Sequence, residues 1–248
     1  MAGRLYLVGT PIGHLGDVSE RAREVLGSVA LVAAEDTRHT GKLLKHLGVS
    51  VRMTSYHDHN ERRKADELVA ALEGGDDVAV VSDAGMPGIA DPGWRVVQGA
   101  LERGIEVTAV PGPTALILAL VVSGLPTHRF TFEGYLSRKP GARRKQLAQL
   151  RAEERTMIFY ETPHRLDATL RDMLVAFGER RASLSRELTK QHEETVRGSL
   201  SDLVEHVARR TPRGEYVILV AGAATASSTD EQPDVERWVP PNGSSLHA

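Results

Sequence analysis

Residues 78–93 read VAVVSDAGMPGIADPG and give the clearest indication of the fold class. Four apolar residues come first, and a run this short and unbroken is typical of a strand that is buried on both faces of a sheet. A twelve-residue segment rich in glycine and proline follows at once. A buried strand that ends in a long shaped loop indicates a parallel α/β sheet, in which ligands bind at the carboxyl ends of the strands.

The same rhythm of strand and helix recurs on both sides of this stretch. Strands are predicted at residues 5–8, 30–34, 51–54, 78–81 and 107–110. Helices are predicted between them at residues 19–26, 37–47, 61–72 and 94–102. Short apolar strands that alternate with amphipathic helices predict an α/β fold with a doubly wound, mostly parallel sheet.

Three predicted loops at one edge of this sheet are rich in glycine and proline, at residues 9–13, 82–93 and 111–114. Glycine lets the backbone approach a ligand closely and proline fixes the shape of a loop, so we expect a binding crevice there. The first loop lacks the Gly-Lys-Ser/Thr ending of an ATP-binding loop and the spacing of a dinucleotide fingerprint. Pro11 also removes an N–H group that a phosphate would need. The crevice therefore suits a less anionic ligand.

The second half of the chain orders its elements differently. Strands are predicted at residues 156–160, 183–186, 194–197 and 216–221, and helices at 143–151, 166–177 and 200–208. This order predicts a second domain with a mixed sheet. We expect an N-terminal α/β domain over residues 1–122, a C-terminal mixed α/β domain over 123–222 and a flexible tail over 223–248.

The composition is that of an ordinary globular protein. Of 248 residues, 26% are charged and 41% are hydrophobic, with a formal net charge of −2, which argues against a disordered or fibrous protein. The absence of cysteine excludes a disulfide scaffold, a thiolate nucleophile and a cysteine-ligated metal site. No apolar run reaches the roughly 18 residues of a membrane span. A strand-like run already starts at residue 5, so no secretory signal is expected and the cytoplasm is the expected location.

Acidic residues follow two of the predicted strands. Asp36 lies in the segment AEDTR and caps the following helix, or it lies with Glu35 and Arg38 on the rim of the crevice. The two interpretations are compatible. Glu161 starts the next helix, where the helix dipole favours it, or it faces the cleft between the domains.

Two further patterns, a pair of histidines and a run of basic residues, do not identify a site by themselves. His57 and His59 share one face of an extended segment, but no third metal ligand lies at a fitting spacing, so a polar loop is favoured and no metal is expected. Residues 138–145 hold five basic residues and no acidic one. Such a run is either a solvated surface or a contact for RNA phosphates, and the run alone does not decide between them.

Five motifs together resemble the tetrapyrrole methylase superfamily, in its branch that methylates ribosomal RNA. They are LVGTPIGHLGD at 7–17, AEDTR at 34–38, SDAGMPGIADPG at 82–93, VPGPTA at 110–115 and FYETPHR at 159–165. The resemblance runs in order from about residue 4 to residue 222. It implies a two-domain fold with S-adenosylmethionine bound in the cleft between the domains, and 2′-O-methylation of a cytidine in the decoding centre of 16S rRNA. It also implies the small ribosomal subunit as the partner, and a homodimer.

The resemblance also assigns cofactor contacts. In this chain they fall on Pro11, Val81, Ser82, Asp83, Met86, Thr114, Ala115, Glu161 and Gly198. The loop after the fourth strand departs from the Gly-Gly-Asp-Pro of tetrapyrrole-modifying members, and Glu161 replaces their usual methionine. Both departures fit the RNA branch. Members commonly continue past residue 222 with a small helical domain, where this chain has a short polar segment.

Methylation of a 2′-hydroxyl needs a base, since the hydroxyl is a poor nucleophile until it loses its proton. The sequence favours Asp36 for this role, with Glu161 second. RNA phosphates are expected to meet basic residues near the crevice and in the basic run, namely Arg38, Arg143, Arg144, Lys145 and Lys190. Two alternatives stay open. One is a tetrapyrrole methyltransferase of the same fold, and the other is a non-catalytic, cofactor-binding module that associates with the ribosome.

Overall fold

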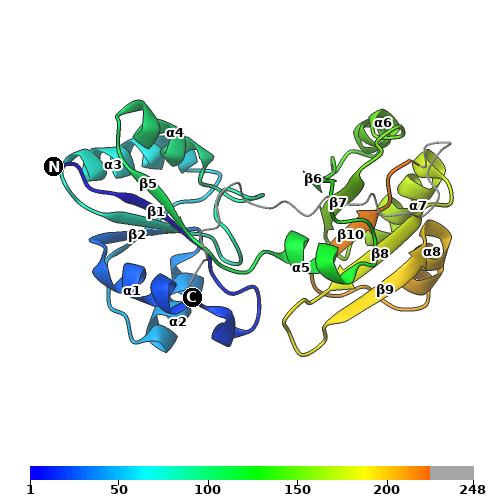
Figure 1. Cartoon of the computed structure of the whole chain (residues 1–248), viewed down its shortest axis with the longest axis horizontal. Helices are drawn as coiled ribbons and strands as arrows, with labels where there is room; N and C mark the ends of the chain where they lie inside the picture. Colours follow the sequence, from blue (N-terminus) through cyan, green and yellow to red (C-terminus); the bar gives the residue numbers. More distant parts are fainter. Residues whose placement is uncertain (224–248) are drawn as a thin grey trace, which may run out of the picture.

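The computed structural model describes residues 1–223 of the chain. It contains two five-stranded sheets, joined in the middle of the molecule by helix α5 (Ala115–Val122) (Figure 1). The remaining part of the chain, which includes nearly all of the predicted tail, lies outside the described residues. Within residues 1–223, no helix is both long enough and apolar enough to cross a membrane.

The first sheet is parallel throughout and has the strand order β3-β2-β4-β1-β5. Its strands are β1 (Leu5–Val8), β2 (Leu31–Ala34), β3 (Met53–Ser55), β4 (Val78–Val81) and β5 (Val107–Val110). Every residue of β2 and β4 is buried, as expected for central strands that are covered on both faces.

Helices cover both faces of this sheet. The helices α1 (Glu20–Ser28) and α2 (Thr37–Leu47) pack on one face, where Leu26 and Leu43 meet alternate strand residues. The helices α3 (Glu61–Glu73) and α4 (Trp94–Glu102) pack on the other. The doubly wound parallel sheet predicted from the sequence is therefore confirmed.

The second sheet is mixed and has the strand order β6-β7-β10-β8-β9. Its strands are β6 (Phe130–Tyr135), β7 (Thr156–Glu161), β8 (Arg181–Arg186), β9 (Glu194–Ser199) and β10 (Tyr216–Val220). Only β6 and β7 run parallel, and the other pairs are antiparallel. The predicted mixed sheet is confirmed.

The second sheet has three helices on one face and one on the other. The three are α6 (Pro140–Gln149), α7 (Leu166–Phe177) and α8 (Leu200–Ala208). On the opposite face α5 packs Leu116 and Leu120 against Ile158 and Leu219. Both α5 and β6 were missing from the sequence prediction. The predicted boundary after residue 122 stays a prediction, and α5, which precedes it, packs on the second sheet.

Candidate active site

A cavity lies between the two sheets, at the carboxyl ends of the parallel strands. The loops after β1, β2, β4 and β5 form one wall, which we call the first-sheet wall. The ends of β6, β7 and β8, the segment that follows β8, and the start of β10 form the opposite wall, the second-sheet wall. The crevice predicted from the loops is therefore found, and it extends over residues from both halves of the chain.

The three glycine- and proline-rich loops are fixed against each other. Thr10 and Gly85 exchange two backbone hydrogen bonds, at 2.9 and 3.1 Å, which join the first loop to the loop after β4. A Cβ on Gly9 would lie 2.7 Å from the Cα of Gly112 and 2.7 Å from the sulfur of Met86. Only glycine fits there, because any side chain would push the loops apart.

In the first-sheet wall, carboxylates join the residues that follow β2 to those that follow β4. The backbone N–H of Asp83 donates to Oε2 of Glu35 at 3.1 Å, and the N–H of Asp36 donates to Oδ1 of Asp83 at 3.0 Å. Both Glu35 and Asp83 line the cavity. Burial raises the pKa of Glu35, while the hydrogen bond from Asp83 opposes that shift.

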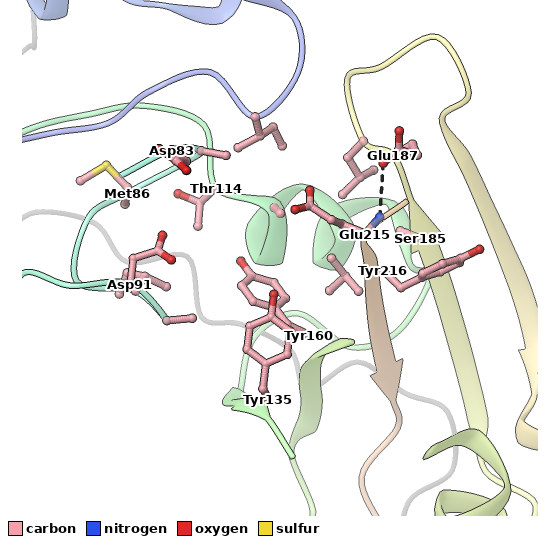
Figure 2. Close-up of a pocket in the computed structure, with 18 of the residues that line it drawn as sticks. Asp83, Met86, Asp91, Thr114, Tyr135, Tyr160, Ser185, Glu187, Glu215 and Tyr216 are labelled. Atoms are coloured by element: carbon pink, nitrogen blue, oxygen red, sulfur yellow. Dashed lines mark hydrogen bonds between the residues drawn. The ribbon is translucent and has the colours of Figure 1, made fainter. Parts of the chain in front are cut away.

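Asp91 is the third carboxyl of the first-sheet wall. Its pKa is raised to about 7, first by burial and then by the negative charge of Glu35, with Asp83 contributing. The preceding residue, Ala90, has a φ of 62°, a left-handed backbone conformation that costs energy for a residue other than glycine. The side chain of Asp91 lies on the same side of the cavity as Asp83 and Met86 (Figure 2).

The second-sheet wall combines aromatic and charged groups. Tyr135 and Tyr160 lie at the ends of β6 and β7, with ring centroids 5.7 Å apart. Across from them, Oε1 of Glu187 accepts a hydrogen bond of 3.2 Å from the backbone N–H of Glu215 (Figure 2). Lys190 pairs with both of these glutamates, at 3.0 and 3.3 Å. Burial alone would lower the pKa of Lys190, but the two glutamates raise it.

The cavity is acidic overall. Its lining holds Glu35, Asp83, Asp91, Glu187 and Glu215 against a single lysine. S-adenosylmethionine carries a positive sulfonium and a positive ammonium group beside one carboxylate, so its net positive charge fits this acidic lining. Buried apolar side chains beside the carboxylates offer a surface for an adenine ring, namely Ile12, Leu188 and Val217.

The structure brings together some of the predicted cofactor contacts. Asp83, Met86, Thr114 and Ala115 all line the cavity. Three others are buried directly beside it without lining it, namely Pro11, Val81 and Ser82.

Gly198 and Glu161 lie away from the lining. Gly198 is in β9, where a Cβ would lie 2.7 Å from a carboxylate oxygen of Asp202. Glu161 is 2% exposed, and its carboxylate accepts from the hydroxyl of Thr169 at 2.6 Å and pairs with Arg165 at 3.3 Å. As a cofactor contact or a base, each stays a prediction, and neither presents a group to the cavity in this structure.

Asp36 points elsewhere than its neighbour Glu35. Its carboxylate caps α2 by accepting the backbone N–H of Arg38 at 2.8 Å, and it binds the guanidinium of Arg38 at 2.7 Å. These hydrogen bonds hold the pKa of Asp36 well below its usual range. Asp36 therefore caps α2, as one of the two interpretations predicted, and it does not line the cavity.

The predicted RNA contacts divide into exposed and engaged side chains. Arg144 and Lys145 are exposed on α6, and Arg38 is exposed although paired with Asp36. Arg143, in contrast, is 5% exposed and binds the carboxylate of Asp172 at 2.7 Å. In this structure its guanidinium is therefore unable to meet a phosphate. Lys190 is occupied inside the cavity, as described above.

Several groups of the cavity received no role from the sequence. Asp91 lies inside a quoted motif, and a carboxyl in a glycine-rich loop was the signal that could have found it. Tyr135, Glu187 and Glu215 carried no local signal, because distant segments bring them to the cavity.

The His57–His59 segment forms a polar loop. Its histidine rings meet edge to face, with centroids 6.0 Å apart, and the N–H of His57 donates to Asn60 at 2.9 Å. Over the described part of the chain, no group of three or more histidine or acidic side chains could hold a metal ion.

Comparisons with known proteins agree with this geometry. The family model of Tetrapyrrole (Corrin/Porphyrin) Methylases matches residues 4–204. A ribosomal RNA small subunit methyltransferase I from Synechocystis sp. is 52% identical over 222 residues, covering 89% of this chain and 80% of the relative. The protein of that name from Escherichia coli O157:H7 is 48% identical over 223 residues, covering 89% and 78%.

Solved structures share the fold. The methyltransferase CobJ superposes with a TM-score of 0.66 at 20% identity, covering 92% of this chain and 98% of that one. A uroporphyrin-III C-methyltransferase from Thermus thermophilus, complexed with S-adenosyl homocysteine, gives a TM-score of 0.61 at 20% identity, covering 88% and 97%. The family model and the sequence relatives establish that the chain belongs to the tetrapyrrole methylase family, in the group of ribosomal RNA small subunit methyltransferases I, and that it is a methyltransferase whose cofactor is S-adenosylmethionine.

Proposed function

We propose that the protein methylates the ribose 2′-oxygen of a cytidine in the decoding centre of 16S rRNA. The observation that carries the proposal is Asp91, a carboxyl with a pKa of about 7 in the cavity that four of the predicted cofactor contacts line. A hydroxyl acceptor needs a base that works near neutral pH, and this carboxyl meets that need. The names of the relatives supply the substrate class, since they are small-subunit ribosomal RNA methyltransferases.

Bound S-adenosylmethionine supplies an electrophilic methyl group, and its sulfur keeps the electron pair of the broken C–S bond. The Asp91 carboxylate accepts the proton of the 2′-hydroxyl while an oxygen electron pair forms the new C–O bond. Asp91 is proposed ahead of Asp36, whose pKa is lowered by Arg38 and whose carboxylate is outside the cavity. Glu35 and Asp83 are joined by a hydrogen bond beside Asp91, and their negative charges help to keep the pKa of Asp91 high.

Exposed basic groups are proposed to meet the RNA backbone. Arg144 and Lys145 on α6, and Arg38 on the first-sheet side, are exposed and available for phosphates.

We further propose that the enzyme works in the cytoplasm as a homodimer. The apolar side chains of Ile117 and Val121 support a self-contact, because they lie one turn apart on α5 and are 43% and 64% exposed.

The test is transfer of a tritiated methyl group from S-adenosylmethionine to 30S subunits that lack the modification, followed by nuclease mapping of the labelled nucleoside. Label on the ribose of a decoding-centre cytidine is expected. Label on a base, or on another nucleoside, would overturn the proposed acceptor.

Sedimentation of the protein before and after Val121→Glu tests the homodimer separately, and an unchanged sedimentation coefficient would overturn this contact.

A further inference from the structure

Tyr135 is a half-exposed aromatic ring at the rim of the cavity. It ends β6, lines the cavity and is 49% exposed. The apolar residues deeper in the cavity, Ile12, Leu188 and Val217, are at most 9% exposed. Figure 2 shows Tyr135 between Asp91 on one side and Glu215 on the other. An aromatic ring in this position leaves a flat apolar surface open to an incoming group.

The backbone of β6 is bent to place this ring. The pairing of β6 with β7 shifts register between Phe132 and Gly134, which marks a β-bulge. Gly134 has a φ of 61°, which glycine adopts without strain. A bulge redirects the side chains that follow it, and such bulges recur next to active sites.

Neighbouring groups hold the ring from behind. Tyr135 meets Tyr160 edge to face at 5.7 Å, and Tyr160 meets Phe132 in the same way at 4.9 Å. The hydroxyl of Tyr160 accepts a hydrogen bond of 3.2 Å from the backbone N–H of Leu116, which fixes that ring. Tyr135 is therefore supported on one side, while its exposed part remains available.

A buried ion pair fixes the chain just after Tyr135. The guanidinium of Arg165 donates to the carbonyl of Leu136 at 2.7 Å and pairs with Glu161 at 3.3 Å. Glu161, which the sequence singled out, thus acts through Arg165 on the end of β6. The exposed basic residues Arg138 and Lys139 follow within four positions of Tyr135, so a polyanion held there would pass the ring.

We propose that Tyr135 is the stacking platform for the base of the target nucleotide, which leaves its helix or loop and enters the cavity beside the cofactor. The inference rests on the proposed function, because it needs an RNA acceptor. A ribose inside a cavity requires its nucleotide to be turned out of the RNA stack, and aromatic side chains hold such bases by stacking. In this proposal the adenine of the cofactor contacts the buried apolar side chains of Ile12, Leu188 and Val217, and the ribose of the target nucleotide faces Asp91.

The test compares Tyr135→Ala, Tyr135→Phe and Phe130→Ala. Phe130 is the matched control, since it is 37% exposed on the same strand and does not line the cavity. For methyl transfer to 30S subunits, Tyr135→Ala is expected to lower kcat/KM by about 5- to 100-fold, the range for loss of one base–aromatic stack. Tyr135→Phe and Phe130→Ala should stay within about 3-fold of the wild type, because the first keeps the ring and the second is outside the cavity.

Three readouts besides activity make the test specific. Calorimetry with S-adenosylhomocysteine should give the same Kd for Tyr135→Ala and wild type, and circular dichroism should give the same Tm. In 30S subunits reconstituted with pyrrolo-cytidine at the target position, wild type with S-adenosylhomocysteine should change the fluorescence of the probe, and Tyr135→Ala should not.

Unchanged kcat/KM in Tyr135→Ala would overturn the platform. A Kd for S-adenosylhomocysteine that weakens as much as methyl transfer does would overturn it too, because the ring would then belong to the adenine of the cofactor. A wild-type enzyme that labels no cytidine ribose would overturn the proposed function and the platform together. Failure of the platform alone is distinguished by full wild-type labelling.

Discussion

The first-sheet wall and the second-sheet wall of the cavity present different groups to the same space. The first-sheet wall brings Glu35, Asp83 and Asp91 from loops after parallel strands. The second-sheet wall brings Tyr135 and Tyr160 from strand ends, with Lys190 held between two glutamates. The parallel sheet gathers several loops at one edge, so like charges come close there, and the charge of Glu35 adds to burial in raising the pKa of Asp91. The mixed sheet instead presents side chains of its strands, which suit recognition of a large surface.

This contrast predicts a division of labour. Changes in the first-sheet wall should lower kcat, because they touch proton transfer. Changes in the second sheet and its helices should alter stability or RNA affinity and leave the chemical step intact.

The largest effect is expected for Asp91→Asn in the first-sheet wall. Loss of the base should lower kcat for methyl transfer at least about 100-fold, while the Kd for S-adenosylhomocysteine stays within a few fold. In the wild type, kcat/KM should rise with pH through about 7, because the carboxyl must be ionised to accept a proton and its pKa is raised to about 7. Asp66→Asn is the control, an exposed carboxyl on α3 outside the cavity. A flat pH profile, or equal losses in both variants, would contradict the role of Asp91.

The next effect is on stability, through the packing of α6 on α7. Arg143→Ala removes one partner of a buried pair with Asp172, whose side chains are 6% and 15% exposed. The free energy of unfolding should fall by about 3 kcal/mol, since a buried carboxylate loses its partner. Arg144→Ala, at a side chain that is 62% exposed, should change it by less than about 0.5 kcal/mol. Urea unfolding measures both, and equal values would mean that the burial of Arg143 has no structural role.

The basic run illustrates what the sequence can and cannot predict. Its charge marks the segment as a candidate for RNA, but Arg143 and its neighbour Arg144 differ only in the side of α6 on which they lie. The buried side is set by the packing of α6 on α7, whose Asp172, 29 residues after Arg143, binds Arg143 at 2.7 Å and lies 4.0 Å from Arg144. The same limit applies to Asp36 and Glu35, where the strand end decides which carboxylate caps α2 and which enters the cavity.

The predicted strands of the parallel sheet were found because buried parallel strands are short apolar runs with a clear end. The two missed elements lack such a signal. Helix α5 reads ALILALVV, which is apolar on every side and shows no helical period. Strand β6 contains a bulge and no buried residue, so its pattern is irregular. These two elements supply Ala115 and Tyr135 to the cavity. The motif at 110–115 still identified Ala115, whereas nothing local in the sequence identified Tyr135.

A smaller effect is expected on RNA affinity. Arg144→Glu with Lys145→Glu should weaken binding of 30S subunits by about 10-fold at low salt and reduce the salt dependence, because phosphate contacts release counterions. The kcat of methyl transfer at saturating 30S should stay unchanged. Arg62→Glu with Arg63→Glu is the matched control, an adjacent basic pair on α3. Equal weakening by both pairs would indicate a general charge effect, and no weakening would make the run on α6 a solvated surface.

The smallest effect is expected for Asp36→Asn, and it decides between neighbouring carboxylates. Asparagine also caps a helix well, so α2 should keep its first turn, and only the ion pair with the exposed Arg38 is lost. Methyl transfer should stay within about 3-fold of wild type, since general-base loss costs far more than that. Measured beside Asp91→Asn under the same conditions, the two variants separate a base from a cap. A loss in Asp36→Asn as large as that in Asp91→Asn would return the base to Asp36, and would require its carboxylate to leave Arg38 when the substrate binds.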